Sequence, residues 1–382
     1  MLTKFRLDNF TSFKIDTTVE IDRTNYKILS DKNIYEDTLK GVMFVGANAS
    51  GKTNIIRGLK FLLDMLFAEK NLNLSTYHCL FSKETYFVLE YDFNIKGHSI
   101  NYLIQYDVAE EAFIEKLKID NRVVLNRVGS SAETEITEAK IYSDIDKNSL
   151  LLREIYFNTK FRNNSVLKEW FLFLLNSVYL DGYKRQVFSP GKFPLGLNEY
   201  LEAEGVESIN SFFEVYNFNQ RVEYSNKSSG QYTAITAKEK DIFFKREGVG
   251  EPIPYPMESL GNQNLLNLLP SFFHVIKNGG MLIVDEFSSG LHNFLEELLI
   301  AYFMKHSKNS QIIFVSHSTN LLTNSLLRPD QLYAVDFVSI DGSKIKRFSS
   351  EKPREAQNLE KMYTSGVFGG IPKFSDEKNN FE

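Results

Sequence analysis

Cysteine is almost absent from this sequence: Cys79 is the only one in 382 residues. A lone thiol excludes an intramolecular disulfide and a thiolate metal cluster, and it fits a reducing cytoplasm. We therefore interpret Cys79 as a small buried hydrophobic residue.

Segments that would direct the chain to a membrane are lacking as well. The amino-terminal "MLTKFRLDNF" has no apolar core of a signal peptide, and no run reaches the roughly 18 apolar residues that span a bilayer. The apolar stretch at residues 166–180 is interrupted by Lys168 and Glu169 and is predicted to be a buried helix. These absences predict a cytoplasmic protein without a membrane partner.

A basic excess is the third feature that is missing. The net charge is −5, so no global positive field attracts nucleic acid, and any DNA contact requires a local patch. Sustained heptad repeats are also missing, which excludes a long coiled-coil arm. What remains is a composition typical of globular proteins, 43% hydrophobic and 24% charged, in a chain long enough to bury a large core.

The order of apolar patterns predicts an α/β protein. Period-two segments at residues 2–22 and 85–120 are typical of strands, and a polar loop is predicted after the last of them. Residues 125–144 are rich in turn and charged residues. Residues 150–218 are predicted to be mainly helical. From residue 257 onward, helix and strand patterns alternate three times, which is typical of half of an α/β unit.

Residues 44–55, "FVGANASGKTNI", carry the spacing G-x-x-x-x-G-K-T between an apolar strand and a helical pattern. Glycines let the backbone N–H groups of such a loop approach phosphates, and the amino end of the helix adds a favourable dipole. Lys52 is expected to reach the β- and γ-phosphates of ATP, and the Thr53 hydroxyl to bind Mg²⁺. The predicted ATP-binding residues are Gly46, Ala47, Asn48, Ala49, Ser50, Gly51, Lys52, Thr53 and Asn54.

A second buried strand supplies the acids that a P-loop ATPase needs. In "GGMLIVDEFSSGLH" (279–292), the continuous apolar run at 281–284 suits a strand that is buried on both faces. Asp285 follows it as the second predicted metal-binding residue, beside Thr53. Glu286 is predicted to orient or deprotonate the attacking water.

The separation of these motifs narrows the class of ATPase. Lys52 and Asp285 lie 233 positions apart, so a segment is inserted between them, as the ATP-binding-cassette (ABC) class tolerates. Just before the second strand, "ESLG" offers Ser259 and Gly261 as a turn that caps a helix. In ABC ATPases such a signature turn meets the γ-phosphate of the opposite protomer through its N–H groups. Asn262 completes the predicted signature.

Two further motifs stand in the order that this class requires. "QIIFVSHSTNLL" (311–322) places His317 at the end of an apolar strand, where it is predicted to contact the γ-phosphate or the attacking water. "SSGLH" (288–292) occupies the D-loop position, which crosses the dimer interface in this class. Ser289 is assigned to that interface, and His292 is open between an interface role and an ordinary surface role.

"LDNFTSFK", the P-loop, "ESLG", "LIVDE" and "VSHS" together resemble the ATPase heads of the RecF and structural-maintenance-of-chromosomes (SMC) class. The chain is more similar still to compact bacterial abortive-infection ATPases of the AbiL/RloA-like group. The ending "EKMYTSGVFGGIPKF" (360–374) carries the resemblance through a set of five residues. These are Tyr363, Gly366, Phe368, Gly369 and Pro372.

The resemblance implies an α/β P-loop NTPase of ABC type, with a mixed central sheet, a flanking antiparallel β-lobe and a helical insertion between the P-loop (Walker A) and the signature. Its expected parts are an amino-terminal ATPase lobe (1–110), a β and helical insertion (111–240) and a carboxy-terminal ATPase lobe (241–382) with signature, Walker B, D-loop and H-loop motifs.

The resemblance also implies an ATP- and Mg²⁺-dependent homodimer that acts as a sensor or scaffold in anti-phage defence. Its expected partner is a separately encoded effector such as a nuclease or toxin, and DNA or a phage component is a further candidate. No intrinsic nuclease is predicted. The alternative is a RecF/SMC-like ATPase that acts on DNA directly in repair or recombination.

Three departures from the family pattern affect specific contacts. Thr11 stands where relatives often carry a basic residue, which puts a phosphate contact from that position in doubt. Asn262 stands where many members have threonine. No glutamine could be assigned to the Q-loop, so the sequence leaves open what completes the metal site between the lobes.

Overall fold

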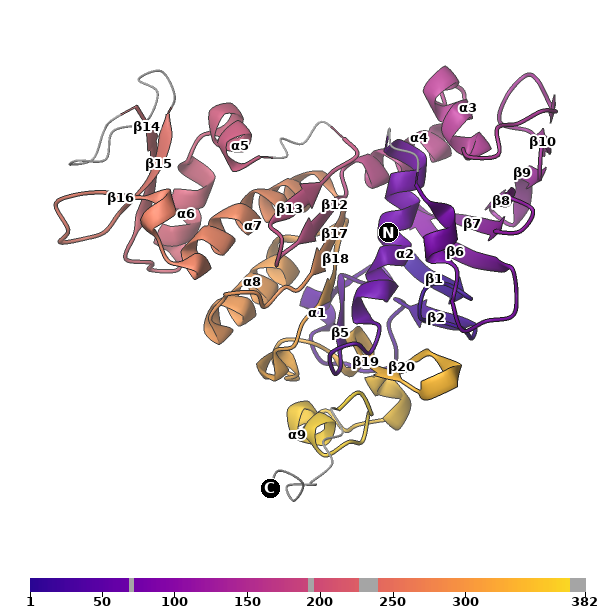
Figure 1. Ribbon diagram of the computed structural model, residues 1–382. Coiled ribbons are helices and arrows are strands. Elements are labelled where there is room, and N and C mark those ends of the chain that lie inside the picture. Colours follow the sequence, from indigo (N-terminus) through magenta and orange to yellow (C-terminus); the bar gives the residue numbers. More distant parts are fainter. Residues whose placement is uncertain (69–71, 192–195, 227–239, 372–382) are drawn as a thin grey trace, which may run out of the picture.

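The computed structural model describes residues 1–68, 72–191, 196–226 and 240–371. A seven-stranded sheet lies at its centre, in the order β13-β12-β17-β18-β5-β19-β20 (Figure 1). The five inner strands are parallel, and the two edge strands are antiparallel to their neighbours. The strands are β5 (Gly41–Val45), β12 (Val178–Asp181), β13 (Gln186–Phe188), β17 (Gly280–Asp285), β18 (Ser310–Val315), β19 (Leu332–Phe337) and β20 (Ser343–Arg347).

Both faces of this central sheet are covered, as the apolar runs predicted. All six residues of β17 are buried. Met281 and Ile283 belong to a core shared with α2 (Lys52–Phe67) and the second sheet. Leu282 and Val284 belong to a core on the other face, shared with the helices α7 (Leu260–Asn278) and α8 (Asn293–His306). A strand enclosed on both sides needs an uninterrupted apolar sequence, which is why this one was recognisable.

The second sheet has eight antiparallel strands in the order β11-β10-β9-β8-β7-β6-β1-β2. It lies beside α2, which separates it from the central sheet (Figure 1). The buried Tyr91 hydroxyl of this sheet donates a hydrogen bond to the Gly58 carbonyl of α2 at 2.6 Å. The strands are β1 (Leu2–Asp8), β2 (Thr17–Glu20), β6 (Tyr86–Ile95), β7 (His98–Asp107), β8 (Ala112–Ile119), β9 (Arg122–Val128), β10 (Ser131–Thr134) and β11 (Ile141–Tyr142).

The segment 125–144, which the sequence marked only as rich in turn and charged residues, extends the antiparallel sheet through β9, β10 and β11. Its charged residues mostly alternate onto the exposed face. The exception, Arg127, is fully buried and pairs with the equally buried Glu115 at 2.9 Å. A buried pair is tolerated only when its remaining polar atoms are bonded, and Glu115 also accepts the Leu151 amide at 2.7 Å.

The prediction of a helix over residues 166–180 is correct only for its first part. Helix α4 ends at Leu175, and three residues later the chain enters β12 of the central sheet. The third alternating helix expected after β18 is replaced by short 3₁₀ turns, η3 (Thr319–Leu321) and η4 (Pro329–Gln331). The α-helices other than α2 are α1 (Ser30–Asn33), α3 (Leu151–Thr159), α4 (Ser165–Leu175), α5 (Leu197–Glu204), α6 (Glu207–Val215), α7 (Leu260–Asn278), α8 (Asn293–His306) and α9 (Leu359–Thr364).

Two smaller sheets complete the fold. Strands β14 (Arg221–Ser225), β15 (Asp241–Lys245) and β16 (Ile253–Pro254) form one of them, and β3 (Ile34–Tyr35) pairs with β4 (Thr38–Leu39) to form the other. The predicted part boundary at 110/111 falls between the paired strands β7 and β8. No helix within the described ranges is both long and apolar enough to cross a membrane.

Candidate functional site

The P-loop joins β5 to α2, and its backbone has little freedom. Gly51 caps α2 with a φ of 106°, and a Cβ at this position would lie 2.2 Å from the Ser343 hydroxyl oxygen, so only glycine fits. The buried Lys52 ammonium donates to the carbonyls of Gly46 at 2.9 Å and Ala47 at 2.8 Å. Burial lowers the pKa of Lys52. The lysine is thus held within the loop that is predicted to receive phosphates.

The structure brings the two predicted metal-binding residues together across most of the chain. The Thr53 hydroxyl donates to a carboxylate oxygen of Asp285 at 3.1 Å. Hydroxyl and carboxylate oxygens are the ligands that Mg²⁺ prefers in nucleotide sites, where phosphates and water complete its shell. The chemistry of this pair therefore fits Mg²⁺.

Asp285 is an unusually placed acid, with a side chain buried at the end of β17. Burial, together with the neighbouring carboxylates of Glu286 and Asp181, raises its pKa to about 6 against the opposing effect of the hydrogen bond from Thr53. A buried carboxylate without a full set of partners favours its neutral form. A bound divalent cation would supply the missing positive charge.

Glu286 and His317 also meet, from the ends of neighbouring strands. The His317 Nε2 atom lies 3.5 Å from a carboxylate oxygen of Glu286. The contact with His317 lowers the pKa of Glu286, so this carboxylate stays ionised at neutral pH. Glu286 has a φ of 56°, a left-handed conformation that costs a non-glycine residue free energy and is commonly found at functional sites.

The predicted signature turn lies at the amino end of α7. Ser259 caps this helix by accepting the Asn262 amide at 3.3 Å, and its side chain is exposed. The Asn262 side chain turns inward and donates to Glu258 at 2.7 Å and Gln220 at 3.0 Å. Asn262 therefore stabilises the turn from its buried side, whereas the Ser259 side chain faces solvent.

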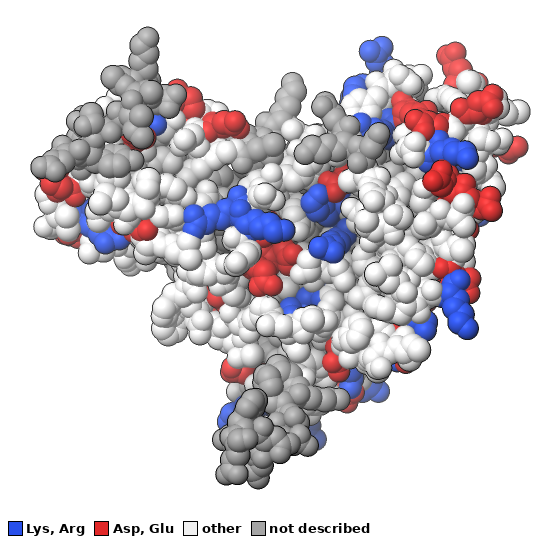
Figure 2. All heavy atoms as spheres, in the orientation of Figure 1, with Lys and Arg blue, Asp and Glu red and all other residues white. Residues whose placement is uncertain are grey.

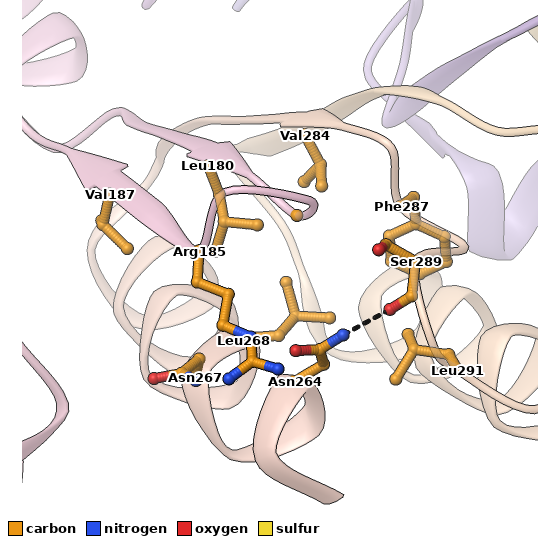
Figure 3. Close-up of a pocket in the computed structure, with 11 residues that line it drawn as sticks. Leu180, Arg185, Val187, Asn264, Asn267, Leu268, Val284, Phe287, Ser289 and Leu291 are labelled. Atoms are coloured by element: carbon orange, nitrogen blue, oxygen red, sulfur yellow. Dashed lines mark hydrogen bonds between the residues drawn. The ribbon is translucent and has the colours of Figure 1, made fainter. Parts of the chain in front are cut away.

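The predicted D-loop lies directly against α7, the helix that begins with the predicted signature turn. A Cβ on Gly261 would be 2.7 Å from the Gly290 carbonyl oxygen, so glycine is required for the close approach. Asn264 of α7 donates to the Ser289 carbonyl at 2.7 Å, beside a small pocket lined by α7, the D-loop and the β12–β13 turn (Figure 3). His292 caps α8 by accepting the Phe294 amide at 3.3 Å, which gives it a local structural role.

Residues 42–323 match a family model described as "AAA domain, putative AbiEii toxin, Type IV TA system". The chain belongs to this AAA family. The match covers the P-loop, the signature turn, Asp285, Glu286 and His317. None of the curated proteins matches the chain.

Solved structures agree with the fold of this AAA-family chain. It is similar to an SMC head domain from Thermotoga maritima, with 16% identity and a TM-score of 0.50 over 90% of this chain and 97% of that one. An SMC head bound to the C-winged helix domain of ScpA is 15% identical, with a TM-score of 0.52 over 90% and 96% of the two chains.

A third similar structure is an SMC head with an extended coiled coil, bound to the C-terminal domain of ScpA derived from Pyrococcus furiosus. It is 16% identical, with a TM-score of 0.50 over 92% of this chain and 97% of that one. The predicted fold class, an ABC-type P-loop NTPase with a mixed central sheet and an antiparallel lobe, is thereby confirmed.

Asp181 is a candidate site residue of the AAA-family chain that the sequence analysis missed. It ends β12 and pairs in register with Asp285 on the neighbouring parallel strand. The following Gly182 amide donates to the Asp285 carbonyl at 2.8 Å. Asp181 thus stands at the edge of the predicted metal site, for which no Q-loop glutamine was found. The available signal was "VYLD", a short apolar run that ends in an acid, like "LIVD".

The face of the AAA-family chain that carries the β12–β13 turn holds charges of both signs. Lys and Arg side chains gather around a few acidic ones in the middle of the view, near β12 and β13 (Figure 2). The β12–β13 turn contributes the exposed Lys184 and Arg185. Arg57 on α2 is exposed too, and its charge opposes the rise in the pKa of Asp285. Such local cations favour a polyanionic ligand despite the negative net charge.

Replacing Asp285 by asparagine is expected to stabilise the metal-free protein by about 2–3 kcal/mol at pH 7.5, since each pKa unit corresponds to about 1.4 kcal/mol. The folded pKa of about 6 exceeds the unfolded value, so the folded wild type binds more protons between these values and loses stability as the pH rises through them. Thermal unfolding in a metal chelator measures the difference between the two proteins.

That difference should shrink as the pH falls from about 6 towards 4. Asp37→Asn is the matched control, because the Asp37 side chain is 83% exposed, and it should show no such gain. An Asp285→Asn protein that is no more stable than wild type at pH 7.5 would contradict the prediction that the buried, ionised Asp285 carboxylate destabilises the metal-free protein.

Proposed function

We propose that the chain binds ATP with Mg²⁺, dimerises around two ATP molecules and hydrolyses them. In this proposal Lys52 and the P-loop amides hold the phosphates, Thr53 and Asp285 hold the metal, and Glu286 activates the water with His317 beside it. Magnesium would polarise the γ-phosphate and neutralise the charge that develops on it. The predicted AbiL/RloA-like membership and the three-part division are part of this proposal.

The observation that carries the dimer is the orientation of the signature turn. Ser259 is exposed at the amino end of a 19-residue helix. The Asn262 side chain is hydrogen-bonded to Glu258, and Gly261 packs against the Gly290 carbonyl, so neither is free to face outward. No hydrogen bond among the described residues joins Ser259 to the P-loop. An exposed helix amino end is suited to bind an anion, so a phosphate held by a second copy is the natural ligand.

We further propose that the ATP-driven dimer controls a separately encoded effector in anti-phage defence. The family description, with its reference to an AbiEii toxin and a toxin–antitoxin system, supports this reading. The titles of two similar structures describe SMC heads bound to a partner protein. We therefore expect this chain to bind a protein partner.

Phage infection of cells that carry this gene with its neighbouring genes tests the defence role. Wild type should lower phage plating, and Lys52→Ala should restore it because the phosphates lose their lysine. Lys305→Ala is the matched control, since Lys305 is exposed on α8, and it should protect like wild type. Protection that persists in Lys52→Ala would argue against an ATP-controlled effector.

The alternative, a RecF/SMC-like ATPase that acts on DNA, is favoured by one observation, the exposed cations Arg57, Lys184 and Arg185. Direct DNA contact would give ATP-dependent binding that weakens steeply with salt, because cations released from phosphates are part of the driving force. DNA binding of this kind by the purified protein, without phage protection, would select the alternative.

A further inference from the structure

The carboxy-terminal segment that carries the family-like ending touches two loops of the candidate site. We call residues 355–371 the tail. They include α9 and the turn that follows it, with Tyr363, Gly366, Phe368 and Gly369, whereas Pro372 lies outside the described residues. Figure 1 shows α9 close to β19 and β20 of the central sheet. The role of this ending was not explained by its sequence.

The far end of the tail binds the P-loop. The Ala47 amide donates to the Gly370 carbonyl at 2.8 Å, and the Tyr363 hydroxyl donates to the same carbonyl at 3.0 Å. The Ala47 amide and the Gly46 carbonyl belong to one peptide unit, and that carbonyl accepts the Lys52 ammonium. Because a peptide unit is planar, Gly370 fixes the orientation of the carbonyl that holds the lysine.

The near end of the tail binds the segment that follows His317. The Thr319 hydroxyl, two positions after the histidine, donates to a carboxylate oxygen of Glu360 on α9 at 2.7 Å. The Asn324 side chain donates to the tail carbonyls of Glu355 at 2.8 Å and Gln357 at 2.9 Å. The tail is therefore bonded to both loops that are predicted to contact the γ-phosphate.

The tail between these two ends is well packed. The Phe368 ring stacks on Phe348 with centroids 3.8 Å apart and an interplanar angle of 11°, and Tyr363 packs against the same ring. The Val367 amide donates to the Met362 carbonyl, which closes the turn onto α9. Gly370, with a φ of 73°, fits against the Val335 carbonyl, where a Cβ would lie 3.0 Å away. A densely packed segment transmits displacement instead of absorbing it.

We propose that the tail is a positioning element that couples the P-loop to the His317 loop. When Lys52 leaves the Gly46 carbonyl for a phosphate, the Gly370 contact keeps the peptide unit in place. The contact with Glu360 holds the His317 loop in register with it. This inference rests on the proposed ATP binding, and it predicts that a change at one end of the tail is detected at the other.

Thr319→Val tests the coupling, since valine keeps the shape of threonine and removes only the hydroxyl that bonds to Glu360. Hydrogen exchange resolved to the Ala47 amide is expected to become about five-fold faster, the equivalent of one neutral hydrogen bond. A fluorescent ADP analogue should bind about five-fold more weakly. Thr319→Ser keeps the hydroxyl and should resemble wild type in both measurements.

Tyr363→Phe is the second variant, because it removes the hydroxyl bond to Gly370 and leaves the aromatic ring in place. It should likewise speed exchange at Ala47, and it should lower kcat for ATP as well as raise KM, because the His317 loop is displaced with the tail. Exchange in the remote strands β9 and β10 should stay unchanged in both variants, which shows that the fold is intact.

Unchanged Ala47 exchange and unchanged binding of the ADP analogue in a folded Thr319→Val protein would overturn the coupling. Neither of these measurements requires hydrolysis. Suppose that the wild type bound the ADP analogue and the variants changed both measurements as expected, but the wild type did not hydrolyse ATP. The proposed hydrolysis would then be wrong, and the proposed role of the tail would stand.

Discussion

Glu286→Gln is expected to lower the rate of ATP hydrolysis by about 100- to 10,000-fold, the range that a general base contributes. Glutamine keeps the size of the side chain and still accepts a hydrogen bond, but it cannot take a proton from water. The proximity of His317 lowers the pKa of Glu286, so the wild-type base is ionised throughout the neutral range. ATP binding, which depends on Lys52 and the P-loop amides, should persist.

The same variant should accumulate as an ATP-bound dimer, because ATP hydrolysis, the step that would let the two protomers separate, is blocked. Size-exclusion chromatography with light scattering measures the mass with and without ATP and Mg²⁺, and release of phosphate measures the rate. Glu133→Gln is a matched control on the antiparallel sheet, where Glu133 is exposed, and it should behave like wild type. A Glu286→Gln protein that binds ATP and remains a monomer would rule out the ATP-sandwiched dimer.

Mixing two inactive variants is expected to restore hydrolysis, which is the second large effect. Lys52→Ala removes the phosphate-binding lysine and leaves the signature turn intact. Ser259→Arg places a large side chain on the exposed turn and leaves the P-loop intact. If each site is built from the P-loop of one copy and the signature turn of the other, each variant alone should have almost no activity, because every site in its dimer lacks one half.

A mixed dimer of these two variants contains one site in which both halves are intact. With random pairing and independent sites, the mixture should recover about a quarter of the wild-type rate. The controls are each variant mixed with itself and a mixture of Lys52→Ala with Lys305→Ala. If Ser259→Arg alone hydrolyses ATP at the wild-type rate, the site is complete within one chain and the signature assignment fails.

The candidate site could be predicted well where its chemistry follows a buried strand. The residues at 281–284 form an apolar run that ends in Asp285 and Glu286, and the run at 312–315 ends near His317. Strands enclosed on both faces must be continuously apolar, so their ends are visible in the sequence. The glycines and Lys52 of the P-loop were visible for a similar reason, because backbone approach to phosphates restricts the residue types that fit.

Strand β12 and its acid Asp181 were missed because local patterns did not separate them from the preceding helix. Helix α4 is itself apolar, and β12 has only four residues, too few to show a period. Which strands become neighbours is decided by packing between distant segments, and here β12 pairs with β17, about 100 positions later. The charge-rich strands β9 to β11 were missed for the opposite reason, since most of their charges lie on an exposed face.

The sequence by itself determined the fold class of this protein, because the order of its motifs and the number of residues between Lys52 and Asp285 allow few P-loop architectures. Tertiary structure alone decided that Asp181 lies beside Asp285 and that Gly370 binds the P-loop. These contacts join residues far apart in the chain through single hydrogen bonds and strand pairings. Such contacts leave no periodic trace in the sequence, because they depend on where the folded chain returns rather than on which residues are neighbours.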